Sequence, residues 1–281
     1  MLTQRIITAL LMLAILLPAV FYPDPDAFAL VALVLISAGG WEWARLNQAG
    51  PAGALWAGGV CFVMCVVSWY FGFSTHPPVA IWIVAGGVWV ILAAWLLRAG
   101  VPAWSKVSKA VRLVGGLLAL WVAWLAVVQA RIMGINFLFS VLVLVWSADI
   151  FAYFAGRALG GRFFARKLAP SISPGKTWEG VCGGLIGVVV CAFAWRAWDA
   201  TGSAADASFY TLLGRNGAAF MVLALLFMTM MSVVGDLLES LFKRSAGVKD
   251  SSNLLPGHGG VLDRVDALLP ILPLAMVFAT L

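Results

Sequence analysis

The sequence predicts an all-α integral membrane protein with about nine transmembrane helices. Of its 281 residues, 63% are hydrophobic and only 11% are charged, and the mean hydropathy is +1.01. A soluble protein of this length needs far more charge to cover its surface. The charged residues also gather in a few short stretches, which are separated by apolar runs long enough to cross a bilayer.

The apolar runs give the expected helices in order, since a helix needs about 20 apolar residues to cross the hydrocarbon core. The first run follows Arg5 and resembles the apolar part of a signal peptide. No small-x-small cleavage site follows it, so we expect a retained helix. The expected spans are about 5–22, 27–44, 54–73, 78–97, 112–130, 136–155, 179–198, 217–236 and 266–281.

The basic residues set the expected orientation, because cytoplasmic loops carry an excess of Lys and Arg. With the N-terminus inside, all but three of the 18 Lys and Arg residues fall on the cytoplasmic side; the three outside are Arg131, Arg196 and Arg215. Nine spans then place the C-terminus outside, in a multi-pass protein of the cytoplasmic (inner) membrane. The net charge of +6 follows from this topology and from anionic phosphate partners. No interleaved basic and aromatic tract indicates nucleic acid.

The two halves of the chain differ in charge. Residues 1–135 hold almost no membrane-embedded charge, and we expect a scaffold of transmembrane helices that can also carry dimer contacts. Residues 136–281 form the candidate catalytic region. Their long polar loops, about 156–178 and 237–265, both fall on the cytoplasmic side and can share one polar cavity. Paired glycines of the first half are expected at close helix contacts, and these are Gly39-Gly40, Gly58-Gly59 and Gly86-Gly87.

Glu42 is an exception in the first half, because it is a carboxylate inside an apolar run. It lies near a helix end between Trp41 and Trp43, and Trp is enriched at membrane–water interfaces. We therefore expect Glu42 to be an interfacial anchor in preference to a catalytic group.

The segment from Asp236 to Asp266 concentrates charges of both signs. Asp236, Glu239, Ser240 and Lys243 are spaced i, i+3, i+4 and i+7, which places them along one helix face. Asp236 directly follows an apolar run, so its carboxylate is expected at or below the interface, where an unpaired charge costs several kcal/mol. A metal ion or a basic partner would offset that cost. The spacing therefore predicts functional roles for Asp236 and Glu239.

Asp263 and Asp266 are three residues apart at the entrance to the last span, so both can point to one side of a helix. Hard cations such as Mg²⁺ prefer carboxylate oxygens and complete their coordination with water and substrate phosphates. Basic residues nearby would neutralise a polyphosphate, and glycines would let backbone N–H groups approach it; these residues are Lys243, Arg244, Lys249, Gly259 and Gly260.

A second polar constellation runs from Asp149 to Glu179. Asp149, Tyr153 and Gly156 share one face of the sixth span. The sequence Gly175-Lys176-Thr177 resembles the end of a phosphate-binding loop. We reject that interpretation because the upstream glycine position is Pro170 and a membrane helix precedes the motif in place of a strand. Thr177, followed by Glu179-Gly180, instead indicates a helix start whose N–H groups are available to an anion.

Two segments resemble the phosphatidate cytidylyltransferase (CDP-diacylglycerol synthase) family. The first is Ser240-Leu241-Phe242-Lys243-Arg244, four residues, Lys249-Asp250, then Leu255 to Asp266, read LPGHGGVLDRVD. The second contains Asp149, Ala152-Tyr153, Gly156-Arg157 and the run from Ile172 to Gly180. The specific motifs cover about residues 145–270, and the resemblance of the first half rests on hydropathy alone.

The resemblance implies a reaction in which CTP and phosphatidic acid give CDP-diacylglycerol and pyrophosphate, with Mg²⁺, a second cation such as K⁺, and a homodimer. The metal-binding acids of the family map to Asp236 and Asp263, with Asp266 as a third candidate. The groups of the family that would serve the substrates map to Asp149, Arg157, Lys176, Lys243, Arg244, Lys249, Asp250 and His258. We also expect substrate contacts from Tyr153, Ser173, Thr177, Glu179, Glu239, Gly259, Gly260 and Arg264.

Two other classes of protein stay open at this point. A CTP-dependent lipid kinase would use the same metal and nucleotide but attack the γ-phosphate. A polytopic transporter of an anionic substrate would need interrupted helices near the bilayer midplane and an inverted repeat. The sequence shows no internal repeat, and its charges gather at one surface. An assay with labelled CTP and phosphatidic acid separates the three classes.

Overall fold

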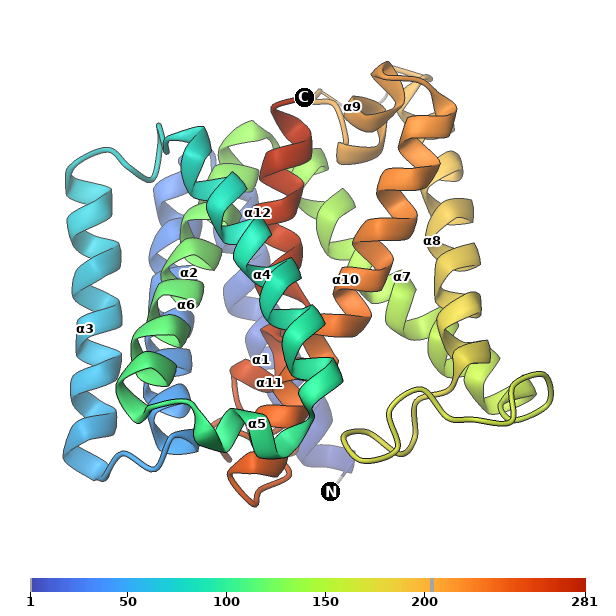
Figure 1. Cartoon of the computed structure of the whole chain (residues 1–281). Coiled ribbons are helices and arrows are strands. Elements are labelled where there is room, and N and C mark those ends of the chain that lie inside the picture. The colour runs from blue at the N-terminus through green and yellow to red at the C-terminus, as the bar shows by residue number, and fades with distance from the viewer. Residues whose placement is uncertain (1, 203–204) are drawn as a thin grey trace.

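Helices make up the regular structure of the protein (Figure 1). The computed structural model describes residues 2–202 and 205–281. Two isolated bridges, in the loops at 169–173 and 255–259, are the β-type pairings found in the described residues. The helices are α1 (Leu2–Phe21), α2 (Pro25–Leu46), α3 (Pro51–Tyr70), α4 (Val79–Ala99), α5 (Val101–Lys106), α6 (Lys109–Met133), α7 (Ile135–Leu159), α8 (Trp178–Asp199), α9 (Phe209–Arg215), α10 (Ala218–Ser245), α11 (Leu262–Val265) and α12 (Leu268–Ala279).

Eight of these helices are long and apolar enough to cross a membrane: α1, α2, α3, α4, α6, α7, α8 and α10. They match the first seven expected spans to within four residues, and α10 begins as expected but extends nine residues beyond the expected end at 236, which confirms an all-α integral membrane protein. The last expected span, 266–281, is a shorter helix of 12 residues with Pro273 inside it. The one-turn helix α11 precedes it. The short helices α5 and α9 had no counterpart among the sequence predictions, because neither is apolar over a membrane-spanning length.

The two long polar loops lie at the same end of the helix bundle. In Figure 1, the loop at 160–177 and the loop at 246–261, which we call the signature loop, are both near the N-terminus, whereas the C-terminus is at the opposite end. Helix α10 packs against α4, α5, α7, α8, α9 and α12, so it joins both halves of the chain. This arrangement confirms that the two loops can contribute to one site.

Gly40, Gly58 and Gly86 mark close helix contacts, as expected, whereas a Cβ atom at Gly59 or Gly87 would meet nothing within 4 Å. A Cβ atom at Gly40 would lie 3.0 Å from the Cβ of Cys61, and one at Gly58 would lie 3.1 Å from the carbonyl oxygen of Ser37. These positions join α2 to α3, where the small residues let the two helices approach closely. Gly86 similarly contacts Leu274 of α12. Gly40, Gly58 and Gly86 therefore serve packing.

Candidate functional site

Asp236 has the basic partner that its depth in α10 requires. The Nζ of Lys176, from the loop before α8, lies 2.6 Å from the Oδ2 of Asp236. Lys176 also donates to the carbonyl oxygen of Val233 at 3.5 Å, and the hydroxyl of Ser240 donates weakly to the Oδ1 of Asp236 at 3.4 Å. One ion pair thus joins the two polar segments that the sequence singled out.

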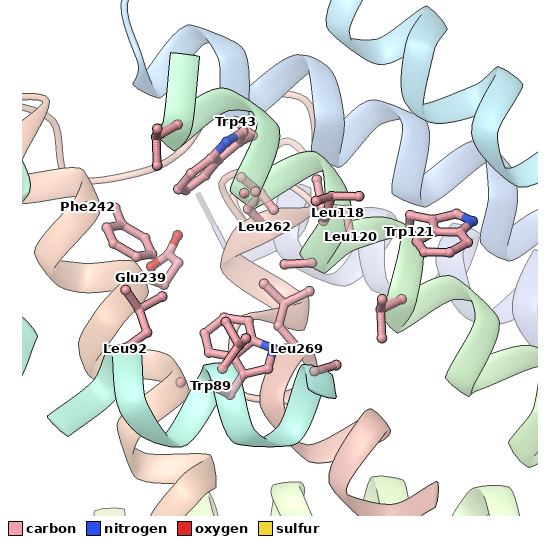
Figure 2. A pocket seen from close by; sticks show the side chains of 18 of the residues that line it. Trp43, Trp89, Leu92, Leu118, Leu120, Trp121, Glu239, Phe242, Leu262 and Leu269 are labelled. Carbon is pink, nitrogen blue, oxygen red and sulfur yellow. The ribbon is translucent and has the colours of Figure 1, made fainter. Parts of the chain in front are cut away.

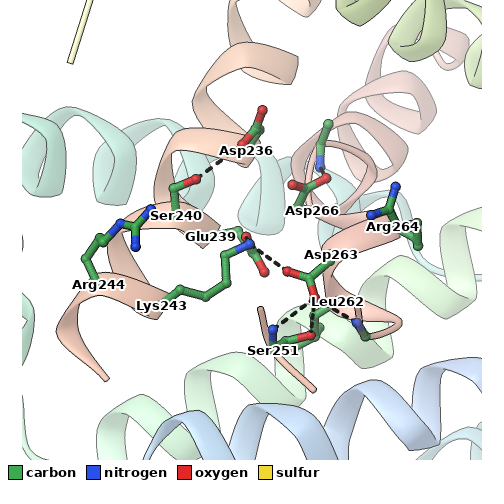
Figure 3. A network of polar contacts seen from close by, with 12 residues as sticks. Asp236, Glu239, Ser240, Lys243, Arg244, Ser251, Leu262, Asp263, Arg264 and Asp266 are labelled. Atoms are coloured by element: carbon green, nitrogen blue, oxygen red, sulfur yellow. Dashed lines mark hydrogen bonds and ion pairs between the residues drawn. The ribbon is translucent and has the colours of Figure 1, made fainter. Parts of the chain in front are cut away.

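Lys243 lies about two turns further along α10, between two carboxylates (Figure 3). Its Nζ forms an ion pair with Glu239 on the same helix and lies 2.6 Å from the Oδ1 of Asp263. The side chains of both acids are only 6% exposed. Two carboxyl groups thus share one ammonium group in a poorly solvated region.

Asp263 is held by the signature loop as well as by Lys243. Its Oδ2 accepts hydrogen bonds from the backbone N–H of Ser251 at 2.9 Å, the hydroxyl of Ser251 at 2.8 Å and the N–H of Gly260 at 2.7 Å. Burial favours the neutral acid, but the donors Lys243, Gly260 and Ser251 outweigh it and lower the pKa of Asp263 to about 2. The stability that this carboxylate gives is therefore present above its ordinary pKa of 3.8 and is lost as the pH falls toward 2.

Asp266 lies on a segment that contacts α10 directly beside Asp236. A Cβ atom at Gly235 would lie 2.7 Å from the carbonyl oxygen of Asp266, so a glycine is needed for this close approach. The Oδ1 of Asp266 accepts from the N–H of Ala267 at 2.7 Å. Burial first, and then the negative charge of Asp236, raise the pKa of Asp266 to about 7. Asp236 and Asp266 therefore crowd each other electrostatically.

The donor set around Asp236 and Asp266 fits a Mg²⁺ ion. Mg²⁺ is usually held by one or two carboxylates, with waters and substrate phosphates in its other positions. Two mutually repelling carboxylates on contacting segments supply that number of protein ligands. In the described residues, no group of three or more His, Cys, Asp or Glu side chains is arranged to hold a metal by itself. Asp263 already accepts from Lys243 and the signature loop, so its role as a ligand stays a prediction.

A polar cavity of about 470 Å³ opens beside Asp236. Thr177 forms the N-cap of α8 by accepting from the N–H of Gly180, which confirms the expected helix start. Arg157 donates to the hydroxyl of Tyr153 at 2.9 Å on the opposite wall, α7. The cavity thus brings most residues of the second polar constellation together with Asp236 of α10. Its polar or glycine lining residues are Asp149, Tyr153, Gly156, Arg157, Gly175, Lys176, Thr177, Gly180 and Asp236.

An apolar cavity of about 760 Å³ is lined by residues of α2, α4, α5, α6, α10, α11 and α12. Figure 2 shows Trp43, Trp89 and Leu269 around it, with Glu239 and Phe242 of α10 at one end. Glu239 is the one ionisable residue among its described lining residues. A nucleotide triphosphate would find no basic partner there, so the lining suits apolar groups.

Other predicted residues lie around these centres with different degrees of exposure. Arg244, in the last turn of α10, and Lys249 and Asp250, in the signature loop, are exposed. Arg264 donates twice to the carbonyl oxygen of His258, at 3.0 and 2.6 Å, and so closes the turn that contains His258. Contact of these residues with a substrate stays a prediction.

Two residues of the second constellation are engaged with their own loop. Glu179 is buried and accepts from the N–H groups of Phe163 and Phe164, each at 3.0 Å, so it fixes the loop that precedes it. Ser173 forms the isolated bridge with Ala169.

Gly259, in the signature loop, has φ +84° and packs against Asp263, where a Cβ would lie 2.7 Å from a carboxylate oxygen.

Glu42 corrects one sequence prediction. It is 0% exposed and lies under the signature loop, so the expectation of an interfacial anchor was wrong. The neighbouring Trp residues suggested an interface, but the sequence did not show that a loop more than 200 residues away folds over this carboxylate. A carboxylate inside an apolar run was the signal that could have found it.

The sequence was compared with known proteins. A model of the cytidylyltransferase family matches residues 3–281. The chain belongs to this family. A phosphatidate cytidylyltransferase of Pseudomonas aeruginosa is 41% identical over 292 residues, which cover 100% of this chain and 97% of that protein. A phosphatidate cytidylyltransferase of Haemophilus influenzae is 36% identical over 302 residues, which cover 99% of this chain and 98% of that protein.

Other phosphatidate cytidylyltransferases match about half of the chain. A phosphatidate cytidylyltransferase of Brucella melitensis is 48% identical over 147 residues, which cover 52% of this chain and 47% of that protein. The full-length matches extend the resemblance beyond residues 145–270, where the motifs lie, to the first half, for which hydropathy alone had supported it. Membership of the cytidylyltransferase family therefore applies to both halves of the bundle.

Proposed function

We propose that the protein transfers the cytidylyl group of CTP to phosphatidic acid, giving CDP-diacylglycerol and pyrophosphate in phospholipid biosynthesis. The observation that carries this proposal is the family match across residues 3–281, together with full-length identity of 41% and 36% to phosphatidate cytidylyltransferases. The ionic centre on α10, beside one polar and one apolar cavity, suits a reaction between a charged nucleotide and a lipid.

The reaction needs charge neutralisation more than a strong base. A phosphate oxygen of phosphatidic acid is already an anion, and it forms a bond to the α-phosphorus of CTP while the bond from that phosphorus to the pyrophosphate oxygen breaks. Both reactants are negative, so the barrier is mainly electrostatic and positional. The residues of the chain are therefore expected to orient two phosphates and to offset their charge.

The basic residues divide between the two polar segments. Lys176 and Arg157 line the polar cavity, where we propose that they orient a substrate phosphate. Lys243 is fixed by Glu239 and Asp263 at the other centre. Arg244 and Lys249 are exposed beside it and are available to the leaving pyrophosphate, and His258 is proposed to donate a hydrogen bond to a phosphate oxygen.

We propose that Asp236 and Asp266 hold a Mg²⁺ ion, with Asp263 as a third candidate ligand. When bound, the ion would neutralise charge on the triphosphate. The crowding of Asp236 and Asp266 supports this proposal. The second cation, K⁺, and the homodimer stay predictions from the family resemblance; flame photometry of the purified protein and chemical cross-linking in membranes test them.

We propose that the site lies on the cytoplasmic side of a bacterial inner membrane. CTP is a cytoplasmic solute, and basic residues gather at the end of the bundle that holds both polar loops. A cysteine at Asn253 in the signature loop should resist an impermeant maleimide in spheroplasts and react after lysis. A cysteine at Ala205, in the loop between α8 and α9, should react in intact spheroplasts. The reverse pattern would contradict the orientation.

Transfer of label from CTP tests the reaction. The purified protein, incubated with phosphatidic acid, Mg²⁺ and α-³²P-labelled CTP, is expected to move label into a lipid product and to release unlabelled pyrophosphate. A lipid kinase would label the lipid only from γ-³²P-labelled CTP, and a transporter would label no lipid from either. Omission of phosphatidic acid is the control. Label in lipid from the γ-position alone would reject the proposal.

A further inference from the structure

Glu42 is a buried carboxylate of the first half that contacts the signature loop directly. It lies on α2 and is 0% exposed. The hydroxyl of Ser252 donates to its Oε1 at 2.6 Å, and the hydroxyl of Ser251 lies 3.2 Å from its Oε2. The backbone N–H of Val261 donates to Oε1 at 2.9 Å and that of Leu262 to Oε2 at 2.8 Å. Both carboxylate oxygens are thus engaged by one loop.

Hydrogen bonds alone compensate the charge of Glu42 in the described structure. An isolated buried carboxylate is very unfavourable unless it is paired or fully hydrogen-bonded. No Lys, Arg or His among the described residues forms an ion pair with Glu42. Charge-assisted hydrogen bonds from backbone N–H groups are stronger than neutral ones. Glu42 is therefore stable in this position only while the signature loop keeps its conformation, and the loop in turn depends on Glu42.

Two carboxylates share the end of the signature loop. Three successive N–H groups point to them: that of Gly260 to Asp263 at 2.7 Å, and those of Val261 and Leu262 to Glu42. The hydroxyl of Ser251 lies between both acids, 2.8 Å from Asp263 and 3.2 Å from Glu42, and its single proton serves one of them at a time. A displacement of Glu42 therefore moves the groups that hold Asp263.

The packing at Gly260 leaves little freedom in this arrangement. Gly260 is buried, and a Cβ atom there would overlap the hydroxyl of Ser251 and the Oε1 of Glu42. A second contact from the first half lies nearby, where the hydroxyl of Thr8 on α1 donates to the carbonyl oxygen of Pro256 at 2.9 Å. Helices α1 and α2 thus both contact the signature loop.

We propose that Glu42 is a positioning residue for the cytidylyl transfer: it holds residues 251–262 so that Asp263 and Lys243 keep the geometry that the reaction needs. This inference rests on the proposed function. Glu42 acts through Ser251, Val261 and Leu262. The proposal thus gives a residue of the first half a role in the reaction. The structure gives the route of that effect as a chain of hydrogen bonds from Glu42 to the donors of Asp263.

The variant Glu42→Gln tests the proposal. Its amide group keeps the shape but turns one acceptor into a donor that faces a backbone N–H or a hydroxyl. We expect kcat to fall about 10- to 100-fold, as is typical when a supporting hydrogen bond behind a reacting group is lost, with a smaller change in the KM for CTP. Hydrogen–deuterium exchange of peptides covering 246–262 should become faster in this variant.

The control is Arg131→Met, which removes another buried charged side chain. Arg131 lies at the end of the bundle away from Glu42 and the signature loop. Arg131 is 8% exposed and donates to the carbonyl oxygens of Val20 at 2.7 Å and Tyr22 at 2.6 Å. We expect this variant to lower the melting temperature in detergent while kcat and the exchange of 246–262 stay unchanged. The comparison separates positioning of the loop from general stability.

The outcomes decide the proposal in each case. An unchanged kcat in Glu42→Gln would overturn the proposal. The same holds if Arg131→Met loses as much kcat as Glu42→Gln when both variants lose the same melting temperature. If Glu42→Gln does not fold, Ser252→Ala, which removes one donor to Glu42, is judged by the same two readouts. If the unaltered protein transfers no cytidylyl group, the proposed function fails. Unchanged hydrogen–deuterium exchange of residues 246–262 in Glu42→Gln would separately refute the proposal that Glu42 fixes the conformation of the loop.

Discussion

Asp263→Asn is expected to abolish the transfer of label from α-³²P-labelled CTP to lipid while the protein stays folded in detergent. Three of the donors to Asp263 converge on Oδ2, so the carbonyl oxygen of the new amide would stay with Ser251 and Gly260. Its NH₂ group would then face the ammonium of Lys243, which now contacts Oδ1 at 2.6 Å. We expect a loss of kcat/KM on the order of 10³-fold, comparable to removal of a preorganised charge-stabilising group.

The control for Asp263→Asn is Asp26→Asn. Asp26 is an exposed carboxylate in the first turn of α2, away from both cavities. The same change of charge there should leave turnover and melting temperature unchanged. Normal activity of Asp263→Asn would exclude both a metal-binding role and a role in holding Lys243. Circular dichroism and size-exclusion chromatography would verify that the inactive variant is folded.

Asp236→Asn is expected to cause a loss of similar size for a different reason. The change removes the partner of Lys176, 2.6 Å away, and one of the two crowded carboxylates proposed to hold Mg²⁺. We expect kcat to fall on the order of 10³-fold, with a higher Mg²⁺ concentration needed for half-maximal rate. Steady-state rates measured across a Mg²⁺ titration give both quantities.

A double variant shows whether Asp236 and Lys176 work as a unit. If they do, Asp236→Asn combined with Lys176→Met should be about as slow as Asp236→Asn alone, because residues that act together are not additive. Ser240→Ala is the matched control, since it removes only the weak 3.4 Å contact to Asp236. Activity of Asp236→Asn within about threefold of the unaltered protein would contradict the central place of Asp236, since such a factor is under 1 kcal/mol.

The sequence predicted the elements that depend on local pattern. Hydropathy located the first eight spans, because each is a continuous apolar run. The position of a carboxylate directly after an apolar run identified Asp236. Helical spacing related Asp236 to Glu239 and Lys243, which lie along one stretch of α10. The N-cap at Thr177 followed from residue type alone. In each case neighbours in sequence decide the outcome.

The remaining features depend on contacts between distant segments. The sequence did not indicate that Lys176 is the partner of Asp236, because the two residues belong to different loops and helices. The pairing of Lys243 with Asp263 depends on the position of α11. The burial of Glu42 depends on a loop that closes a large sequence separation. The shortness of the last helix follows from the turn at Asp266–Ala267, where backbone contact with Gly235 fixes the chain.

The contacts of Thr8 with Pro256 and of Glu42 with Ser252 join positions 248 and 210 residues apart. During synthesis the early helices enter the bilayer long before the ribosome delivers their partners, because domains and segments emerge from the N-terminus first. A nascent chain that stops before residue 251 therefore has an uncovered carboxylate on α2 and no assembled reaction centre. Maturation of this enzyme is in that sense a late event, completed only after residues 251–262 have been synthesised.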